Sequence, residues 1–264
     1  MRSFKIACVG DNCIDYYDES GLAFPGGNPV NVAVYLKRLG AESSYLGAVG
    51  TDSYGELLLR RLSERGVDLS HVQLLSGSTA LCHVSRENGE RILGNYDEGV
   101  MADFRLREED FSFLRGFDLA VTGLWGHAEG SLAAIRSAGT PVAFDGAERP
   151  FDPAGLIALP NTDIAFFSDD RLADEALKEK LLAVAAYGPK LVVATRGAKG
   201  SLVWDGDVFY ACAPVPCTVV DTMGAGDSFI AGFLHAWLQG GDPLFCMQAG
   251  AENAAVTIGC SGAW

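Results

Sequence analysis

Short apolar runs alternate with segments of helical periodicity along most of the chain. Strands that alternate with helices of ordinary length indicate right-handed crossovers and parallel pairing, with helices on both faces of one sheet. The pattern therefore predicts an α/β fold with a mostly parallel central sheet. We expect its strands near residues 4–10, 43–49, 117–121, 142–145, 164–167 and 191–195. We expect its helices near residues 29–40, 54–64, 107–115, 131–138, 170–187, 227–239 and 243–259.

Two stretches interrupt this alternation. Residues 13–24 lose the helical pattern, and residues 72–98 contain strand-like runs around Asn88-Gly89, a dipeptide that strongly favours a hairpin turn. A further hairpin is predicted around Asp205-Gly206-Asp207. We expect one domain over residues 1–264 that carries a small β lid built from about 13–24 and 72–98.

Charge and cysteine content exclude several classes of partner. The formal net charge is −14 and no basic block occurs, which argues against nucleic acid or an anionic membrane as a partner. The seven cysteines show no C-x-x-C spacing, as in proteins with reduced thiols. No apolar run approaches the roughly 18 residues of a membrane span, and no leader precedes the first strand. We expect a cytoplasmic protein.

The stretch Asp221–Ser228 is the most informative part of the sequence. Gly224, Ala225 and Gly226 let the backbone turn tightly and approach a ligand, and the apolar spacing behind them predicts a helix. The free N–H groups and the dipole of a helix start favour an anion. Asp227 beside such a site suits the acceptor of a hydroxyl proton in phosphoryl transfer. A plain turn with Asp227 as a helix cap explains these eight residues equally well.

Three polar, glycine-bearing segments follow predicted strands: 11–15, 195–200 and 221–227. Carboxyl ends of strands in an open α/β sheet meet at one crevice, so these segments are expected to converge. The G-x-x-x-x-G-K-[S/T] loop is absent, which excludes a P-loop enzyme. Phe229 stands where a G-x-G-x-x-G fingerprint needs its third glycine, which disfavours an NAD-dependent oxidoreductase.

Together these residues resemble the ribokinase-like family of carbohydrate kinases. The signature D-[T/S]-x-G-A-G-D is complete at Asp221–Asp227, and the early glycine pair with a following asparagine appears as Gly26, Gly27 and Asn31. The resemblance covers the whole chain. It implies a three-layer α/β/α fold with a β lid, and transfer of the γ-phosphoryl of ATP to a sugar hydroxyl with Mg²⁺. It leaves open a monovalent cation beneath the 221–226 loop, and a dimer through the lid edges.

The resemblance also assigns roles to individual positions. Asp227 would be the catalytic base, and the N–H groups of Gly224, Ala225 and Gly226 would hold the transferred phosphoryl. Sugar hydroxyls would be bound by Asp11, Asp15, Gly27, Asn28 and Asn31. The nucleotide would contact Ser168, Thr195, Gly197, Gly200, Gly226 and Asn253. Each assignment has a rival explanation. Asp11 and Asp15 could be turn residues, residues 195–200 could be an ordinary hairpin connection, and Asn31 and Asn253 could face solvent on their helices.

One position departs from the family. Many members carry N-x-x-E after the strand that here ends near Phe167, where it organises water around Mg²⁺. This chain has Ser168-Asp169-Asp170-Arg171 instead. Asp169 or Asp170 is the expected substitute, and the identity of the metal ligands stays open.

Further segments resemble the branch of this family whose substrate is a ketose joined to an amino acid. They include 96–104, 125–129 and the final Gly262-Ala263-Trp264. Acidic groups near the lid, Asp97 and Glu98, are expected to face the amines of such a substrate. Trp125, His127 and Glu129 follow the strand at 117–121 and are expected to line the sugar end of the crevice. Tyr96 is a further residue expected to bind the substrate. Kinases for other ketoses or keto-sugar acids, and a non-catalytic sugar-binding relative, remain alternatives.

Overall fold

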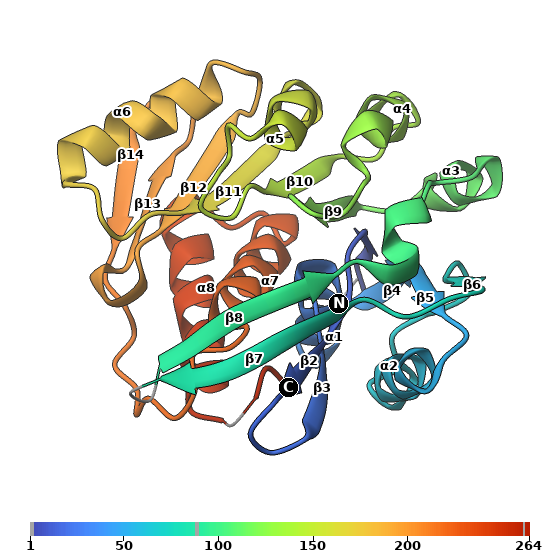
Figure 1. Ribbon diagram of the computed structural model, residues 1–264. Helices are drawn as coiled ribbons and strands as arrows, with labels where there is room; N and C mark the ends of the chain where they lie inside the picture. Colours follow the sequence, from blue (N-terminus) through green and yellow to red (C-terminus); the bar gives the residue numbers. More distant parts are fainter. Residues whose placement is uncertain (1–2, 88–89, 261) are drawn as a thin grey trace.

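The computed structural model describes residues 3–87, 90–260 and 262–264 of the chain (Figure 1). An eight-stranded sheet has the order β14-β13-β12-β11-β10-β9-β1-β4. Pairing is parallel from β4 to β12 and antiparallel for β13 and β14, which confirms a mostly parallel α/β sheet. In chain order its strands are β1 Lys5–Val9, β4 Glu42–Leu46, β9 Leu119–Gly123, β10 Val142–Asp145, β11 Ile164–Ser168, β12 Leu191–Thr195, β13 Ser201–Trp204 and β14 Phe209–Cys212.

Helices cover both faces of this sheet. Its strands are apolar at consecutive positions, and consecutive side chains point to opposite faces, so both faces must be buried. In β1, Ile6 and Cys8 pack with α1, α2, α7 and α8, whereas Ala7 and Val9 pack with residues of α3, α4, α5 and α6. The helices are α1 Asn28–Arg38, α2 Ser53–Glu64, α3 Glu108–Leu114, α4 Leu132–Ser137, α5 Pro153–Ala158, α6 Asp174–Ala185, α7 Ala225–Leu238 and α8 Pro243–Ile258. Short 3₁₀ turns lie at η1 Gly99–Asp103, η2 Glu129–Ser131, η3 Leu159–Asn161 and η4 Gly197–Lys199.

A second sheet is assembled from two separate pieces of chain. Its order is β3-β2-β7-β8, with β2 Cys13–Tyr17 and β3 Leu22–Gly26 from one piece and β7 Leu81–Glu87 and β8 Glu90–Asp97 from the other. Figure 1 shows β7 and β8 as the long antiparallel pair of this sheet. The expected Asn88-Gly89 turn lies outside the described residues, but the strands on either side of it pair as a hairpin requires.

The strand expected over 43–49 is in fact two strands in different sheets. Strand β4 ends before Gly47, where a Cβ would lie 2.6 Å from the carbonyl oxygen of Gly10. The next strand, β5 Ala48–Gly50, pairs in parallel with β6 Gln73–Leu75. The expected start of the 72–98 insertion was therefore wrong. Within that range, residues 73–75 belong to the small β5–β6 sheet, and β7 and β8 are the strands that join the four-stranded sheet.

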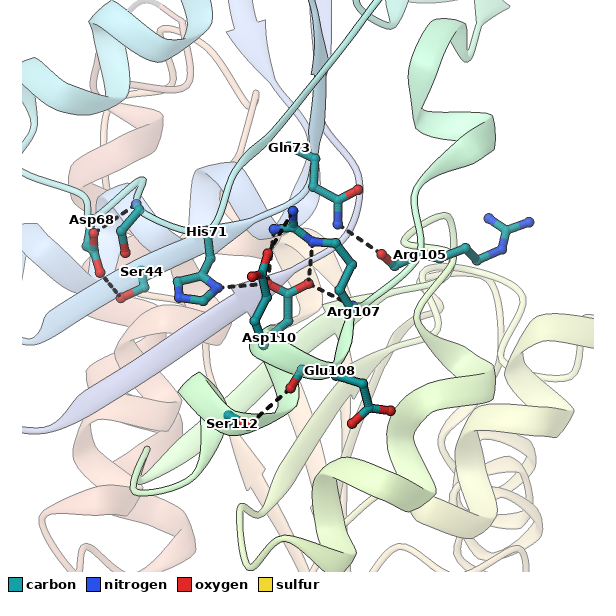
Figure 2. Close-up of polar contacts among 11 residues, drawn as sticks. Ser44, Asp68, His71, Gln73, Arg105, Arg107, Glu108, Asp110 and Ser112 are labelled. Atoms are coloured by element: carbon teal, nitrogen blue, oxygen red, sulfur yellow. Dashed lines mark hydrogen bonds and ion pairs between the residues drawn. The ribbon is translucent and has the colours of Figure 1, made fainter.

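A polar cluster holds the segment before β6 against the start of α3 (Figure 2). His71 Nδ1 lies 2.7 Å from Asp110 Oδ1, and the backbone N–H of Arg107 donates to Asp110 Oδ2 at 2.8 Å. Gln73 Nε2 donates to the carbonyl oxygen of Arg105 at 2.9 Å. Burial alone would raise the pKa of Asp110, but these hydrogen bonds outweigh it and lower the pKa below its usual value. The cluster is structural, since none of these residues lines the cavities described next.

Helix α5 was not among the helices expected from the sequence, whereas α4, of the same length, was. Within the described residues, none of the helices combines the length and apolarity needed to cross a bilayer.

Candidate active site at the start of helix α7

Two cavities lie on either side of the turn that opens α7. One, here called the apolar cavity, is lined mostly by small and aliphatic residues, including Ala225 and Gly226. The other, here called the acidic cavity, is lined by four carboxylates and by Met223. The carboxylates of the acidic cavity are Asp11, Asp15, Asp145 and Asp227. Within residues 223–227, Ala225 and Gly226 thus line the apolar cavity, whereas Met223 and Asp227 line the acidic cavity.

The turn itself depends on a residue without a side chain. Gly224 precedes the first helical residue and has φ +70°, and a Cβ there would lie 2.3 Å from the hydroxyl oxygen of Tyr35. The first N–H groups of a helix have no acceptor within it, so those of α7 are available to an anion. The N–H of Ala225 is an exception, because it donates to the carbonyl oxygen of Thr222 at 3.2 Å. Of the three expected amide donors, Ala225 is therefore engaged within the turn in this conformation.

Two amides of helix α1 hold the carboxylate of Asp227. Asn28 Nδ2 donates to its Oδ1 at 2.7 Å, and Asn31 Nδ2 donates to its Oδ2 at 2.7 Å. Burial raises the pKa of Asp227 to about 6, against the lowering effect of these two hydrogen bonds, and the charge of Asp15 adds to the rise. At neutral pH Asp227 is therefore mostly ionised and still basic enough to take a proton.

The residues expected to bind sugar at the end of β1 do line the acidic cavity. Asp11 is 6% exposed, and its Oδ2 accepts the N–H of Asn28 at 3.2 Å. Its Oδ1 is buried with no hydrogen-bond partner among the described residues, which suits a site completed by a donor on a ligand. Burial raises the pKa of Asp11 to about 6. Asp15 of β2 also lines the acidic cavity, as do Gly27, Asn28 and Asn31.

Asp145 is a cavity residue that the sequence reasoning missed. It ends strand β10, and its Oδ2 accepts a hydrogen bond from Asn28 Nδ2 at 2.9 Å. Burial raises its pKa to about 7, and the charges of Asp227 and Asp11 contribute to the rise. The signal was present, since a carboxylate followed by Gly146 ends a predicted strand, just as the polar segments at 11–15 and 195–200 follow theirs.

Four other residues expected to contact the substrate behave differently from one another. Tyr96 of β8 and Trp125 line the acidic cavity, with 40% and 44% of their surfaces exposed. Glu98 and His127 do not line it; instead, His127 Nε2 lies 3.0 Å from Glu98 Oε1. That contact joins the end of the four-stranded sheet to the loop after β9.

The apolar cavity contains all but one of the residues expected to bind the nucleotide. Ser168 and Thr195 line it from the ends of β11 and β12. The rest of its lining comprises Gly197, Gly200, Ser201, Ala213, Pro214, Val215, Ala225, Gly226, Phe229, Ala251, Ala254, Ala255 and Ile258. Aliphatic walls with a few polar atoms are typical of a pocket for a flat aromatic base.

Asn253 lies outside this cavity, contrary to expectation. Its Nδ2 donates to the carbonyl oxygen of Ser228 at 2.7 Å, and its Oδ1 accepts from Arg38 Nη2 at 2.8 Å. Asn253 thus faces α7 and α1, while Ala251, Ala254 and Ala255 of the same helix face the cavity. Its assignment to the nucleotide site was wrong because spacing within α8 does not reveal which neighbour each side meets.

Asp169 is also occupied by contacts within the protein. Its Oδ2 accepts from Lys180 Nζ at 2.8 Å, and its Oδ1 accepts the N–H groups of Arg171 and Leu172. Among the described residues no three His, Cys, Asp or Glu side chains gather to hold a metal.

Comparison with known families gives a match along nearly the whole chain. The family described as pfkB family carbohydrate kinase matches residues 5–264. A fructoselysine 6-kinase of Shigella flexneri is 45% identical over 259 residues, which cover 98% of this chain and 99% of the relative. A fructosamine kinase of Bacillus subtilis (strain 168) is 37% identical over 264 residues, which cover 98% and 93%.

Solved structures agree on the fold. The structure of Arabidopsis thaliana ribokinase complexed with ribose and ATP superposes with a TM-score of 0.90 at 22% identity, covering 99% of this chain and 94% of that one. Identity at that level carries information on the fold alone. The expected ribokinase-like α/β architecture is confirmed.

Proposed function

The chain belongs to the pfkB family of carbohydrate kinases, and from that membership we propose that it transfers the γ-phosphoryl group of ATP to the 6-hydroxyl of fructoselysine or a similar fructosyl-amino acid. The observation that carries the proposal is the turn 223–227, which separates an apolar cavity from an acidic one. A nucleotide in the first cavity and a sugar in the second would meet at Asp227 and the start of α7.

Residues at the start of α7 and in α1 have different roles in the proposed reaction. Asp227 accepts the proton of the attacking hydroxyl, and Asn28 and Asn31 hold its carboxylate in place. The free N–H groups in the first turn of α7 stabilise the negative charge of the transferred phosphoryl. A base with a pKa of about 6 is adequate, because the proton leaves late in a loose transition state.

The charge of the acidic cavity favours a substrate with an amine. Four carboxylates line it, and among the side chains that the structure describes none of its lining residues is Lys or Arg. A neutral hexose gains only hydrogen bonds from such a site, whereas the protonated amine of a fructosyl-amino acid also neutralises buried negative charge. This argument supports an amine-bearing ketose over a plain one.

The apolar cavity supports ATP as the phosphoryl donor. Thr195, Gly197 and Gly200 place hydroxyl and backbone groups at its edge, beside the start of α7. We propose that Mg²⁺ arrives on the phosphates, where it neutralises their charge. A monovalent cation beneath the 221–226 loop remains a prediction. We also propose a cytoplasmic location, which the seven free cysteines support.

We propose that the four-stranded sheet is the lid of a single kinase domain, and that two copies of the chain pair through it. Strand β3 is an edge strand of that sheet, and its Leu22 and Phe24 are 55% and 43% exposed. Exposed apolar edges of this kind are normally covered. Phe24→Glu is expected to convert a dimer into monomers in light scattering, while Phe151→Glu, at an exposed position outside the sheet, leaves the mass unchanged. A wild-type monomer at micromolar concentration would remove the dimer from the proposal.

The function is tested by a coupled ADP-release assay with ATP and a panel of fructosyl-amino acids, free hexoses and keto-sugar acids. Fructoselysine or a close analogue is expected to give the highest kcat/KM. Preference for a free ketose or a keto-sugar acid would assign the chain to another branch of the family. Sugar binding without ADP release would make it a non-catalytic relative.

A further inference from the structure

Trp264 contacts the residue that holds the proposed base. Its indole Nε1 donates to Asn31 Oδ1 at 2.8 Å, and Asn31 Nδ2 donates in turn to Asp227 Oδ2 at 2.7 Å. An indole nitrogen can only donate, so the Asn31 atom that faces it must be the oxygen. The orientation of the Asn31 amide is therefore determined by Trp264, and it is the one that presents an N–H group to Asp227.

The opposite orientation of the amide would work against the site. It would turn a carbonyl oxygen toward the carboxylate of Asp227, which would replace a hydrogen bond by repulsion. Asp227 already has Asp15, Asp11, Asp145 and the Tyr35 hydroxyl around it, all of which are negative or neutral. Among the described residues, the side-chain amides that donate to Asp227 are those of Asn28 and Asn31, so the opposite orientation of Asn31 would leave Asp227 with one of these two hydrogen bonds.

The segment that carries Trp264, residues 262–264, is hydrogen-bonded to Asp221 of the signature motif and to Tyr35 of α1. The N–H of Gly262 donates to Asp221 Oδ2 at 2.9 Å, and the Tyr35 hydroxyl donates to the carbonyl oxygen of Ala263 at 2.5 Å. The guanidinium of Arg65 lies 5.6 Å from the centre of the Trp264 ring. Residues 262–264 are thereby held against α1 and the start of the signature motif, where the indole N–H has a defined direction.

We propose that Trp264 is a positioning residue, whose indole N–H locks the Asn31 amide so that it donates to Asp227 and keeps that carboxylate aimed and ionised. This inference rests on the proposed function of Asp227 as the base. It adds a residue remote in sequence, and outside the cavity lining, to the set on which turnover depends.

The direct test is Trp264→Phe, which keeps an aromatic ring and removes the N–H. Loss of one hydrogen bond acting through Asn31 is expected to lower kcat by about 3- to 10-fold, with the KM for ATP unchanged. Because Asp227 loses a donor that favours its charged form, the acidic limb of the kcat–pH profile is expected to move to higher pH. Trp204→Phe, in strand β13 of the main sheet, makes the same substitution away from the site and should change neither quantity.

Coupling to Asn31 distinguishes positioning from general destabilisation. In an Asn31→Ala background, Trp264→Phe should lower kcat no further, because the amide it orients is gone. Equal losses in both backgrounds would overturn the inference, as would an unmoved pH limb in the single variant.

A measurement without turnover separates this inference from the proposed function. The pKa of Asp227, followed by carboxyl ¹³C NMR without substrate, should be higher in Trp264→Phe than in the wild type. In the wild type, the indole N–H resonance of Trp264 should shift as Asp227 titrates. An unchanged pKa of Asp227 in Trp264→Phe, or a wild-type indole resonance that does not shift as Asp227 titrates, would refute the positioning role. Failure of every sugar to turn over in the wild type would refute the kinase proposal instead.

Discussion

Asp227 differs from the other carboxylates of its cavity in the donors it has. Asp145 accepts from the side-chain amide of Asn28 and from the backbone N–H of Ala147, and one oxygen of Asp11 has no partner among the described residues, whereas each oxygen of Asp227 accepts from a different side-chain amide. Those donors limit the rise in pKa that burial causes, so Asp227 is ionised at neutral pH. Asp11 Oδ1, in contrast, is proposed to accept a hydrogen bond from the substrate.

The first prediction concerns Asp227→Asn. It removes the proton acceptor and keeps the shape, so kcat should fall by roughly 10²–10⁴-fold, the range for loss of general-base catalysis. Wild-type kcat/KM should fall as pH drops through about 6, because the base acts only when deprotonated and its pKa is about 6. Steady-state assays across pH measure both effects. The exposed Asp103→Asn serves as the control, and near-normal turnover of Asp227→Asn would exclude the residue as the base.

At the scale of elements, helix α1 carries the polar side of the site on one stripe. Asn28, Asn31, Tyr35 and Arg38 recur at intervals of three or four residues, so they share a face of the helix. Asn28 and Asn31 reach Asp227, Tyr35 reaches Ala263, and Arg38 reaches Ser228 and Asn253. Helix α1 therefore links the start of helix α7, helix α8 and the segment 262–264.

The second prediction concerns the turn before α7. Gly224→Ala would place a methyl group against the Tyr35 hydroxyl at a positive φ, so the turn and the amides proposed to bind phosphate must shift. A displacement of about 1 Å near reacting groups can cost roughly 10²-fold in rate, and we expect a loss of kcat of that order. The free energy of unfolding should fall by more than about 1 kcal/mol.

Its control is Gly130→Ala, where an added Cβ meets no atom within 4 Å and φ is not positive. That variant should keep both stability and turnover. A Gly224→Ala enzyme that turned over like the wild type would show that the turn tolerates a side chain, and that its geometry does not limit the reaction.

At the scale of the whole molecule, folding gathers negative charge from distant parts of the chain. Burial raises the pKa of Asp145 to about 7 and those of Asp11 and Asp227 to about 6. A carboxyl whose pKa is raised in the folded state stabilises the fold at low pH and loses that contribution as pH rises through the raised value. The empty cavity should therefore make the protein less stable at pH 8 than at pH 6.

The third prediction uses this linkage. Asp145→Asn removes one buried charge, and its single amide oxygen can keep only one of the two hydrogen bonds that Asp145 accepts, from Asn28 Nδ2 at 2.9 Å or from the N–H of Ala147 at 2.9 Å. At pH 8 loss of the charge should outweigh loss of one hydrogen bond, so the variant should be more stable than the wild type. At pH 5, where the wild-type carboxyl is protonated, it should be no more stable than the wild type. Calorimetry should show a higher unfolding midpoint at pH 8, by about 2–4 °C for each kcal/mol recovered. Activity should fall, because the substrate loses a charged partner. A lower midpoint at pH 8 would contradict the assignment of Asp145 as a strained buried charge.

Much of the site was predictable because its signals are contiguous. The signature at 221–227, the glycine pair at 26–27 and the loop 195–200 each lie within a few residues of one another. Errors arose where contact between elements decides the outcome. Asn253 lies in a correctly predicted helix but faces α7, and residues 73–75 form a strand that pairs with β5 rather than with β7.

The order of most strands and helices, the glycine-rich turn and the carboxylate behind it were determined by the sequence alone, because apolar period and backbone freedom act over short distances. Tertiary structure decided which side chains meet. Asn28 and Asp227 are 199 positions apart, and Asn31 and Trp264 are 233 positions apart. No local pattern encodes such pairings, since they exist only after the sheet and its covering helices bring α1, α7 and residues 262–264 together.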